Sequence, residues 1–184
     1  DRVNKNGMSF KTEIPVEKEK NDEMESVLLN DESKLSFVIN TIPRDAIVSF
    51  DTETTDIDAL KAQIVGFSFA YEENKAYYVP ISHSYLGVPD QISKDAATQA
   101  IVQLNRHKLV LQNFKYDYEI IRHNFDIELK LYADTMILSW LLDTNEKVGL
   151  DYQIDKYFDH KMISFKDVVK KGENFSNVDI LTAC

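Results

Sequence analysis

Between residues 46 and 81 the hydrophobic and polar positions alternate with the two-residue period of β-strands, in three runs. The first run, residues 46–52, indicates a buried strand, and the third, residues 76–81, follows the turn EENK. The second run, residues 63–71, has one face of large side chains and one of mostly small ones, namely Val65, Phe67, Phe69 and Tyr71 against Ile64, Gly66, Ser68 and Ala70. Three strands in hairpin order predict an antiparallel meander.

Around this meander the pattern has mostly the 3.6-residue period of helices. Residues 33–42 form an amphipathic segment that ends before Pro43. Two short apolar runs, residues 108–112 and 128–132, indicate a fourth and a fifth strand. Helices are predicted from the cap Ser93 to Asn105, over residues 116–124, after the cap Asp134, and over residues 150–158 and 164–171. A meander followed by β/α alternation predicts an α/β sandwich around a mixed five-stranded sheet.

The composition is that of a globular protein. The chain has 184 residues, 43% of them hydrophobic, and no apolar run reaches the ~18 residues that span a membrane. Residues 1–33, rich in charged and amide side chains, predict a linker or loosely docked lead-in, so residues 34–184 are expected to form the domain. The start lacks Met and a signal peptide, which indicates a piece of a longer protein. One cysteine, Cys184, excludes a disulfide framework and suits a reducing, intracellular compartment.

The net charge of −10 argues against nucleic-acid binding through a basic surface. Nucleases that hold divalent cations in carboxylate sites are an exception, because the cations supply the positive charge and the protein groups must be acidic.

Two carboxylates end the first predicted strand. Asp51 and Glu53, in the stretch FDTET, are two positions apart and share one face of that strand. At ~6 Å and an effective dielectric constant of ~20, they repel by roughly 3 kcal/mol, which folding alone does not explain. We therefore expect a cation between them. The alternative is a pair of solvated side chains at a strand end.

A third carboxylate follows the fourth predicted strand. Asp117 lies in the first turn of the next helix, where the helix dipole tolerates negative charge. Asn113 and Lys115 give the preceding loop a polar character, and sites in α/β sheets form in such loops. The alternative is that Asp117 only decorates the helix start. Lys115 would steer phosphate or belong to a solvated face.

Several stretches together carry a resemblance to a known family. They are FDTETT, IVGFSFA, YYVPISHSYL, PDQIS, QNFKYD, ADTMILSWLL and HKMISFKDVVKKGEN. In their order and spacing they resemble the 3′–5′ exonuclease (proofreading) domain of bacterial DNA polymerase I, a family A polymerase. The similar region runs from about Leu35 to Cys184. The resemblance implies a ribonuclease H-like (DnaQ-like exonuclease) fold, with helices on both faces of the mixed sheet.

The resemblance also implies a chemistry and its cofactors. Two divalent cations, Mg²⁺ or Mn²⁺, would support hydrolysis of the 3′-terminal phosphodiester of DNA. Asp51 would bridge both ions, Glu53 would bind the ion on the nucleophile side, and Asp117 would support the second ion.

For the substrate, Thr54 and Asn113 would contact the terminal nucleotide. Ile57 would wedge against the last bases, and Phe165 would stack on a base. The alternatives are ordinary packing for Ile57 and the core of a short helix for Phe165.

Other polar residues carry weaker signals. His83 has no evident Ser or Cys partner and is expected to be structural or exposed. Three further histidines lack metal-ligand spacing, namely His107, His123 and His160. Asp134 is expected to be only a helix cap.

The resemblance also defines the expected setting. In the family a third motif, Tyr-x-x-x-Asp, follows the region matching DILTAC, and the sequence stops before it, so we expect weak activity from this chain alone. Expected partners are single-stranded 3′ ends of DNA and the polymerase domain of the parent chain, with no membrane, in the bacterial cytoplasm near the nucleoid. Two alternatives stay open: an inactive exonuclease-like domain of a family A polymerase, and a stand-alone nuclease of the same fold that acts on RNA.

Overall fold

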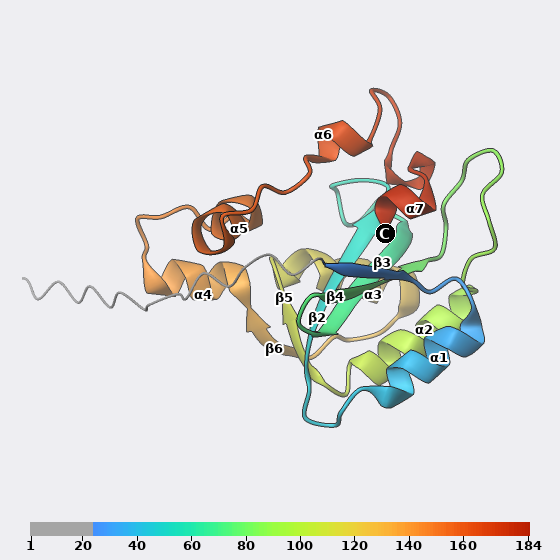
Figure 1. The fold of residues 1–184 in the computed structure, drawn as a ribbon, viewed down its shortest axis with the longest axis horizontal. Helices are drawn as coiled ribbons and strands as arrows, with labels where there is room; N and C mark the ends of the chain where they lie inside the picture. The colour runs from blue at the N-terminus through green and yellow to red at the C-terminus, as the bar shows by residue number, and fades with distance from the viewer. Residues whose placement is uncertain (1–23) are drawn as a thin grey trace, which may run out of the picture.

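This computed structural model describes residues 24–184. At its centre is a six-stranded mixed sheet with the strand order β1-β4-β3-β2-β5-β6 (Figure 1). The strands are β1 Glu25–Leu28, β2 Ile47–Thr54, β3 Ile64–Glu72, β4 Lys75–Pro80, β5 Lys108–Leu111 and β6 Leu131–Asp134. The helices are α1 Glu32–Thr41, α2 Lys94–Leu104, α3 Phe114–Phe125, α4 Thr135–Leu142, α5 Leu150–Phe158, α6 Phe165–Val168, the 3₁₀ helix η1 Phe175–Asn177 and α7 Ile180–Ala183. The predicted meander is confirmed as β2, β3 and β4, which pair in antiparallel fashion.

The sheet has one strand more than the five predicted. Strand β1 lies inside the expected lead-in, where it pairs in parallel with β4. Leu29, which directly follows β1, is buried with 2% of its surface exposed, so this part of the chain belongs to the sheet and its core. The pattern missed β1 because a four-residue edge strand with two exposed positions shows no clear alternation. Residues 1–23 of the expected lead-in lie outside the described residues.

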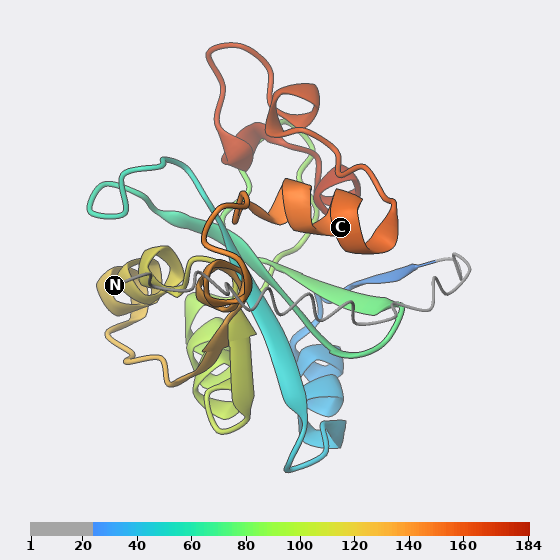
Figure 2. The same cartoon turned by 90° about the vertical axis from the view of Figure 1, so that its left-hand side faces the viewer.

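The two faces of the sheet differ in what covers them. Helices α1, α2 and α3 pack on the face that carries Val48, Phe50 and Phe67, and together they form the main core. Figure 1 and Figure 2 both place α1 and α2 below the sheet and the red C-terminal segment above it. That segment forms a smaller core, in which Phe175 and Val178 pack with Val65 of β3. Helical segments thus lie on both faces, as predicted.

A β-bulge at Val65 corrects the predicted faces of β3. Glu53 pairs with Gly66, but Thr54 pairs with Ile64, which leaves Val65 as an extra residue. Ile64 therefore joins the main core and Val65 the smaller one, opposite to the simple alternation. A bulge re-aims side chains beside it, and this one lies next to Glu53.

Two further boundaries differ from those predicted. Strand β6 starts at Leu131, three residues later than expected, because the Asn105 side chain accepts from the Lys130 N–H at 2.7 Å and donates to the Glu128 carbonyl at 2.9 Å. These bonds hold residues 128–130 outside the sheet. Helix α6 is shorter than predicted and ends where Val169 turns into the smaller core.

Within residues 24–184, no helix combines the length and apolar character that crossing a membrane requires.

Candidate carboxylate site

The end of β2 presents Asp51 and Glu53 on one face of the sheet, as predicted. Asp51 pairs with Ser68 and Glu53 with Gly66 across the antiparallel neighbour β3. These two neighbours on β3 have no large side chains, so β3 does not fill the space beside the carboxylates. Asp51 remains open to solvent, whereas Glu53 is half-buried.

Asp117 reaches the same strand end from α3. Strand β5 pairs with β2 only over Ile47–Ser49, so the last residues of β2 have a free edge on that side. Asp117, in the first turn of α3 and 2% exposed, fills this edge with its carboxylate. Its Oδ1 accepts from the Thr52 backbone N–H at 3.0 Å and from the Thr52 hydroxyl at 2.7 Å. The strand-loop-helix order therefore places Asp117 beside the residue that lies between Asp51 and Glu53.

The pKa values of all three carboxylates are raised above their ordinary values. Burial, followed by the negative charges of Asp51 and Asp117, raises the pKa of Glu53 to about 8. Burial and the charge of Asp51 raise the pKa of Asp117 to about 7, against the lowering effect of the Thr52 bonds. Partial desolvation of its carboxylate raises the pKa of Asp51 to about 6, against the lowering effect of the Thr52 backbone N–H. Negative charge at this place is therefore uncompensated by the protein itself.

This donor set suits a hard divalent cation. All three groups offer carboxylate oxygens, which Mg²⁺ and Mn²⁺ prefer as ligands. A cation among them would relieve the mutual repulsion that raises their pKa values. Within the described residues no three acidic, histidine or cysteine side chains are already closed into a ligand group. The three carboxylates fit divalent cations by charge and by the chemistry of their oxygen atoms.

The start of α3 is held by a carboxylate from another element. Asn113 has a left-handed backbone with φ of 61°, and its side chain makes no capping bond. Asp134 takes that role: its Oδ2 accepts from the Phe114 N–H at 2.9 Å and its Oδ1 from the Asn113 N–H at 3.2 Å. The Asn113 amide is thereby left exposed at the entrance to α3, near Asp117.

Thr54 belongs to a polar bridge between β2 and α3. Its hydroxyl lies 2.5 Å from the Tyr116 hydroxyl, which in turn donates to the Asp56 carbonyl at 2.6 Å. This bridge holds the start of the loop between β2 and β3. Ile57, on that loop, has 94% of its surface exposed, so the packed alternative does not hold within this chain.

The remaining substrate candidates lie further out. Lys115 is exposed on α3 two residues from Asp117. Phe165 starts α6 and is 60% exposed, so it is not part of a helix core here. Thr54 directly follows Glu53 on β2, and Asn113 and Lys115 precede Asp117 at the start of α3, whereas Phe165 lies on a separate C-terminal segment.

The position of His83 agrees with the structural role expected of it. His83 is 4% exposed and makes two ring hydrogen bonds, which confirms a structural position. In the part of the chain that the structure describes, none of the four histidines joins a cluster of potential metal ligands. Asp134 is confirmed as the cap of α4, where it accepts from the Met136 N–H at 2.9 Å.

The sequence pattern does not indicate the hydrogen bonds made by Thr52 and Tyr116, and it indicates only one of the two helix caps made by Asp134. Thr52 lies on the opposite face of β2 from the acidic pair, so its pattern position indicated only a core-facing residue. Tyr116 directly precedes Asp117, and its aromatic ring suggested core packing. For Asp134 the sequence predicts only the cap of α4, because nothing in the sequence connects this residue with α3.

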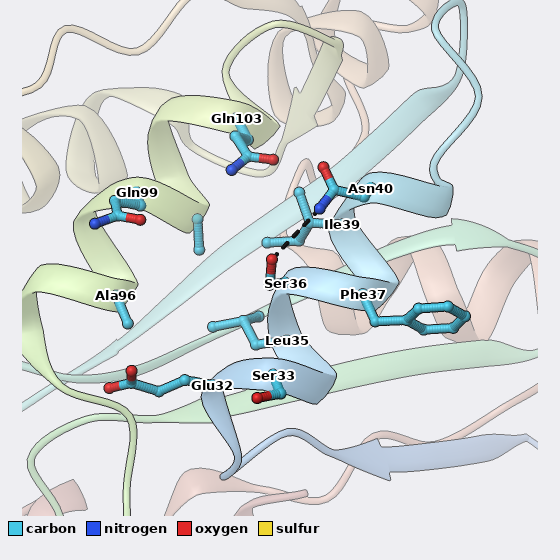
Figure 3. Close-up of a pocket in the computed structure, with 11 residues that line it drawn as sticks. Glu32, Ser33, Leu35, Ser36, Phe37, Ile39, Asn40, Ala96, Gln99 and Gln103 are labelled. Carbon is cyan, nitrogen blue, oxygen red and sulfur yellow. Dashed lines mark hydrogen bonds between the residues drawn. The ribbon is translucent and has the colours of Figure 1, made fainter.

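A groove of about 580 Å³ lies apart from this site, between α1 and α2 (Figure 3). Its lining is aliphatic and amide-rich, with Asn40, Gln99 and Gln103 among the labelled side chains. The Asn40 side chain donates a hydrogen bond to the Ser36 hydroxyl at 3.4 Å. Glu32 is the one carboxylate that lines the groove. Such a lining offers no group of acids comparable with that at the end of β2.

A family model described as 3′–5′ exonuclease matches residues 26–183. DNA polymerase I of Borreliella burgdorferi is 35% identical over 149 residues, which cover 80% of this chain and 16% of that protein. DNA polymerase I of Pseudomonas aeruginosa is 44% identical over 132 residues, covering 68% of this chain and 14% of that protein. The chain therefore spans about one seventh to one sixth of the length of these two relatives.

Solved structures share the fold at low sequence identity. Escherichia coli RNase D, an exoribonuclease involved in structured RNA processing, has a TM-score of 0.59 and 14% identity, covering 87% of this chain and 43% of that one. The Aedes aegypti Nibbler EXO domain has a TM-score of 0.60 and 11% identity, covering 86% and 81%. Brucella melitensis NrnC with bound Mg²⁺ has a TM-score of 0.53 and 11% identity, covering 79% and 67%. The fold is thus ribonuclease H-like, of the DnaQ type.

Proposed function

This chain belongs to the 3′–5′ exonuclease family found in DNA polymerase I, and from that premise we propose that it is the proofreading domain of such a polymerase. Its substrate is the single-stranded 3′ end of DNA, and its reaction is hydrolysis of the terminal phosphodiester. It works beside the polymerase domain of the same chain, in the bacterial cytoplasm and near the nucleoid. The observation that carries the proposal is the trio Asp51, Glu53 and Asp117 at the free edge of β2.

The trio would hold two divalent cations, Mg²⁺ or Mn²⁺. Asp51 would bind both, Glu53 the one on the nucleophile side, and Asp117 the other. When bound, the cations supply an acidified water and neutralise the charge that develops on the leaving 3′-oxygen. Thr52 orients Asp117 through its two hydrogen bonds, which also lower the pKa of Asp117 and so favour its ionised form.

Residues around the trio would bind the end of the strand. The exposed Asn113 amide and the Thr54 hydroxyl offer hydrogen bonds to the terminal nucleotide, and Lys115 offers a positive charge to its phosphate. Ile57 would pack on the last bases and Phe165 would stack on one. Such contacts read backbone and base faces rather than base edges, so we expect no marked sequence preference. A frayed end costs less to unstack, which favours single strands.

The test is Asp51→Ala in the full-length polymerase, with hydrolysis of a single-stranded DNA oligonucleotide measured in Mg²⁺. We expect the rate to fall by roughly 10³-fold or more, the scale on which losing a charge-stabilising group acts. Thermal unfolding should change little or move upward, because a like-charge contact is relieved. Asp45→Ala, in the exposed turn that precedes β2, is the matched control and should retain the parent rate.

Three results would contradict the proposal in different ways. An unimpaired Asp51→Ala variant would remove the trio from the reaction. A parent protein without 3′-end hydrolysis would favour the inactive, structural alternative. Faster hydrolysis of an RNA oligonucleotide than of DNA would favour the ribonuclease alternative.

A further inference from the structure

Tyr78 of β4 lies next to Glu53 on the acidic face of the sheet. The register pairs Asp51 with Ser68 and Ser68 with Tyr78, so these three residues share that face. A Cβ atom added to Gly66 would lie 2.4 Å from the Tyr78 hydroxyl oxygen. Gly66 is the cross-strand partner of Glu53, and the Cβ atoms of such partners are about 5 Å apart. The Tyr78 hydroxyl therefore occupies the place of the side chain opposite Glu53, within the span of a glutamate side chain.

His83 determines where the hydroxyl proton of Tyr78 points. Its Nε2 lies 2.6 Å from the Tyr78 oxygen, and its Nδ1 lies 2.8 Å from the Val178 carbonyl oxygen. A carbonyl oxygen only accepts, so Nδ1 carries the ring proton and Nε2 keeps a lone pair. The Tyr78 hydroxyl consequently donates to Nε2. Burial lowers the pKa of His83 more than its bond to Val178 raises it, which keeps the ring neutral.

Hydrogen bonds also hold the backbone of His83 and of the residues before it. The Gln91 side chain accepts from the His83 backbone N–H at 2.7 Å and donates to its carbonyl at 3.0 Å. Just before it, the N–H groups of Ile81 and Ser82 both donate to the carbonyl of the bulge residue Val65, at 2.9 Å each. The imidazole is thus fixed relative to β3, the strand that pairs with Glu53.

A hydroxyl has a single proton to donate. With that proton committed to His83, the Tyr78 oxygen directs only lone pairs towards Glu53 and does not donate to its carboxylate. If His83 did not accept the proton, the buried hydroxyl would be free to donate it to the Glu53 carboxylate. A hydrogen bond there would compete with a cation for the same carboxylate oxygens.

We propose that His83 and Tyr78 are positioning residues for Glu53: His83 takes the hydroxyl proton of Tyr78 and thereby leaves the Glu53 carboxylate free to bind a divalent cation. The inference rests on the proposed function, because it assigns Glu53 to a metal site. It goes further in giving a buried histidine, which makes no contact with substrate, control over the affinity of that site.

The test measures Mn²⁺ binding to this chain by the electron paramagnetic resonance signal of the free ion. His83→Asn keeps a donor for the Val178 carbonyl but removes the acceptor at the Nε2 position, whereas His83→Gln offers an acceptor there. We expect His83→Asn to weaken Mn²⁺ binding by about tenfold, as loss of an outer-shell partner does, and His83→Gln to bind nearly as tightly as the parent. Adding Tyr78→Phe to His83→Asn should restore binding, because the competing hydroxyl is gone. Tyr77→Phe, which removes a buried hydroxyl from the other face of β4, should change nothing.

Restoration by the second substitution is what a purely structural pair would not produce. If the double variant binds no better than His83→Asn, or if His83→Asn binds like the parent, the inference is overturned. Glu53→Gln separates this failure from that of the proposed function: unaltered Mn²⁺ binding in Glu53→Gln would overturn the metal site itself. If His83→Asn does not fold, nitrogen NMR of the unaltered chain decides, since a proton on Nε2 of His83 contradicts the inference and a proton on Nδ1 supports it.

Discussion

Asp117 is oriented by a threonine rather than by a basic side chain. Thr52 supplies two neutral donors, which fix one carboxylate oxygen without neutralising its charge. A lysine or arginine in that place would pair with the carboxylate and compete with a cation. The arrangement thus holds the acid in place while its negative charge stays available.

Thr52→Val tests whether the Thr52 hydroxyl orients Asp117, because valine keeps the shape of threonine and loses the hydroxyl donor. The Thr52 bonds lower the pKa of Asp117, so their weakening should raise that pKa above its value of about 7. We expect the acidic limb of the pH–rate profile of the full-length protein to shift to higher pH, with a rate loss of about tenfold at neutral pH. Thr98→Val, which removes a hydroxyl bonded to the Lys94 carbonyl on α2, is the control. A profile identical to that of the parent would contradict this reading.

At the scale of single residues, sequence patterns predicted what depends on local period. The shared face of Asp51 and Glu53 followed from strand alternation, and the place of Asp117 from a helix start. The contact between Thr52 and Asp117 did not follow, because it depends on where β5 stops pairing with β2. That endpoint is a property of two strands sixty residues apart and leaves no local signal.

At the scale of elements, one buried carboxylate joins two helix starts. Asp134, 5% exposed, accepts from Asn113 and Phe114 at α3 and from Met136 and Ile137 at α4. The first turns of both helices therefore share one acceptor group. Since α3 carries Asp117, the same residue sets the position of a site carboxylate.

Asp134→Ala should lower the free energy of unfolding by about 2–4 kcal/mol. Two caps are lost at about 1 kcal/mol each, and buried N–H groups are left without an acceptor. Urea unfolding of the chain measures the loss. Asp31→Ala is the matched control, because Asp31 caps only α1 through one exposed bond to the Lys34 N–H at 2.8 Å. Its loss should be about 1 kcal/mol, and an equal loss in both variants would contradict the double role of Asp134.

Element boundaries were predictable where the chain itself ends an element. Ser93 caps α2 and Pro43 follows α1, and both boundaries hold to within two residues. The boundary of β6 and the bulge at Val65 were not predictable, because side chains and strands distant in sequence impose them. The faces of β3 consequently came out wrong for Ile64 and Val65, although the strand itself was expected.

At the scale of the whole molecule, the site carboxylates make folding sensitive to pH. Their pKa values, about 6, 8 and 7 for Asp51, Glu53 and Asp117, lie above the ordinary values of 3.8, 4.5 and 3.8. Between these limits the folded chain binds more protons than the unfolded chain. Their contribution to stability is therefore fully present below about pH 4 and is lost as the pH rises through about 6 to 8.

We expect this loss to appear in thermal unfolding of the chain in EDTA at a series of pH values from 5 to 8. Glu53→Gln should flatten the decline, because one of the three titrating groups is removed and its neighbours are relieved of its charge. Adding Mg²⁺ at pH 8 should raise the unfolding temperature of the parent more than that of Glu53→Gln, since a ligand bound only to the folded state stabilises it. The same slope in both proteins would show that other groups control the pH dependence.

The fold class followed from the order of elements, since a meander and then β/α alternation allow few arrangements. What the order did not reveal was the outermost strand. Strand β1 completes the sheet by binding along β4, with Glu25 bonded to the Asn74 carbonyl at 2.8 Å and Leu29 to the Tyr78 carbonyl at 2.8 Å.

That strand has a practical consequence for anyone who recombinantly shortens the protein. A fragment that begins at residue 34, where composition suggests a boundary, would lose β1 and its backbone hydrogen bonds to β4. The bare edge would then present a row of unpaired amides and carbonyls to other molecules, and strand edges of this kind recruit one another. Such a piece should elute as dimers and larger species in size-exclusion chromatography, while one begun before Glu25 should not. Residues 25–28, which composition assigns to a linker, would thus determine whether the domain remains monomeric.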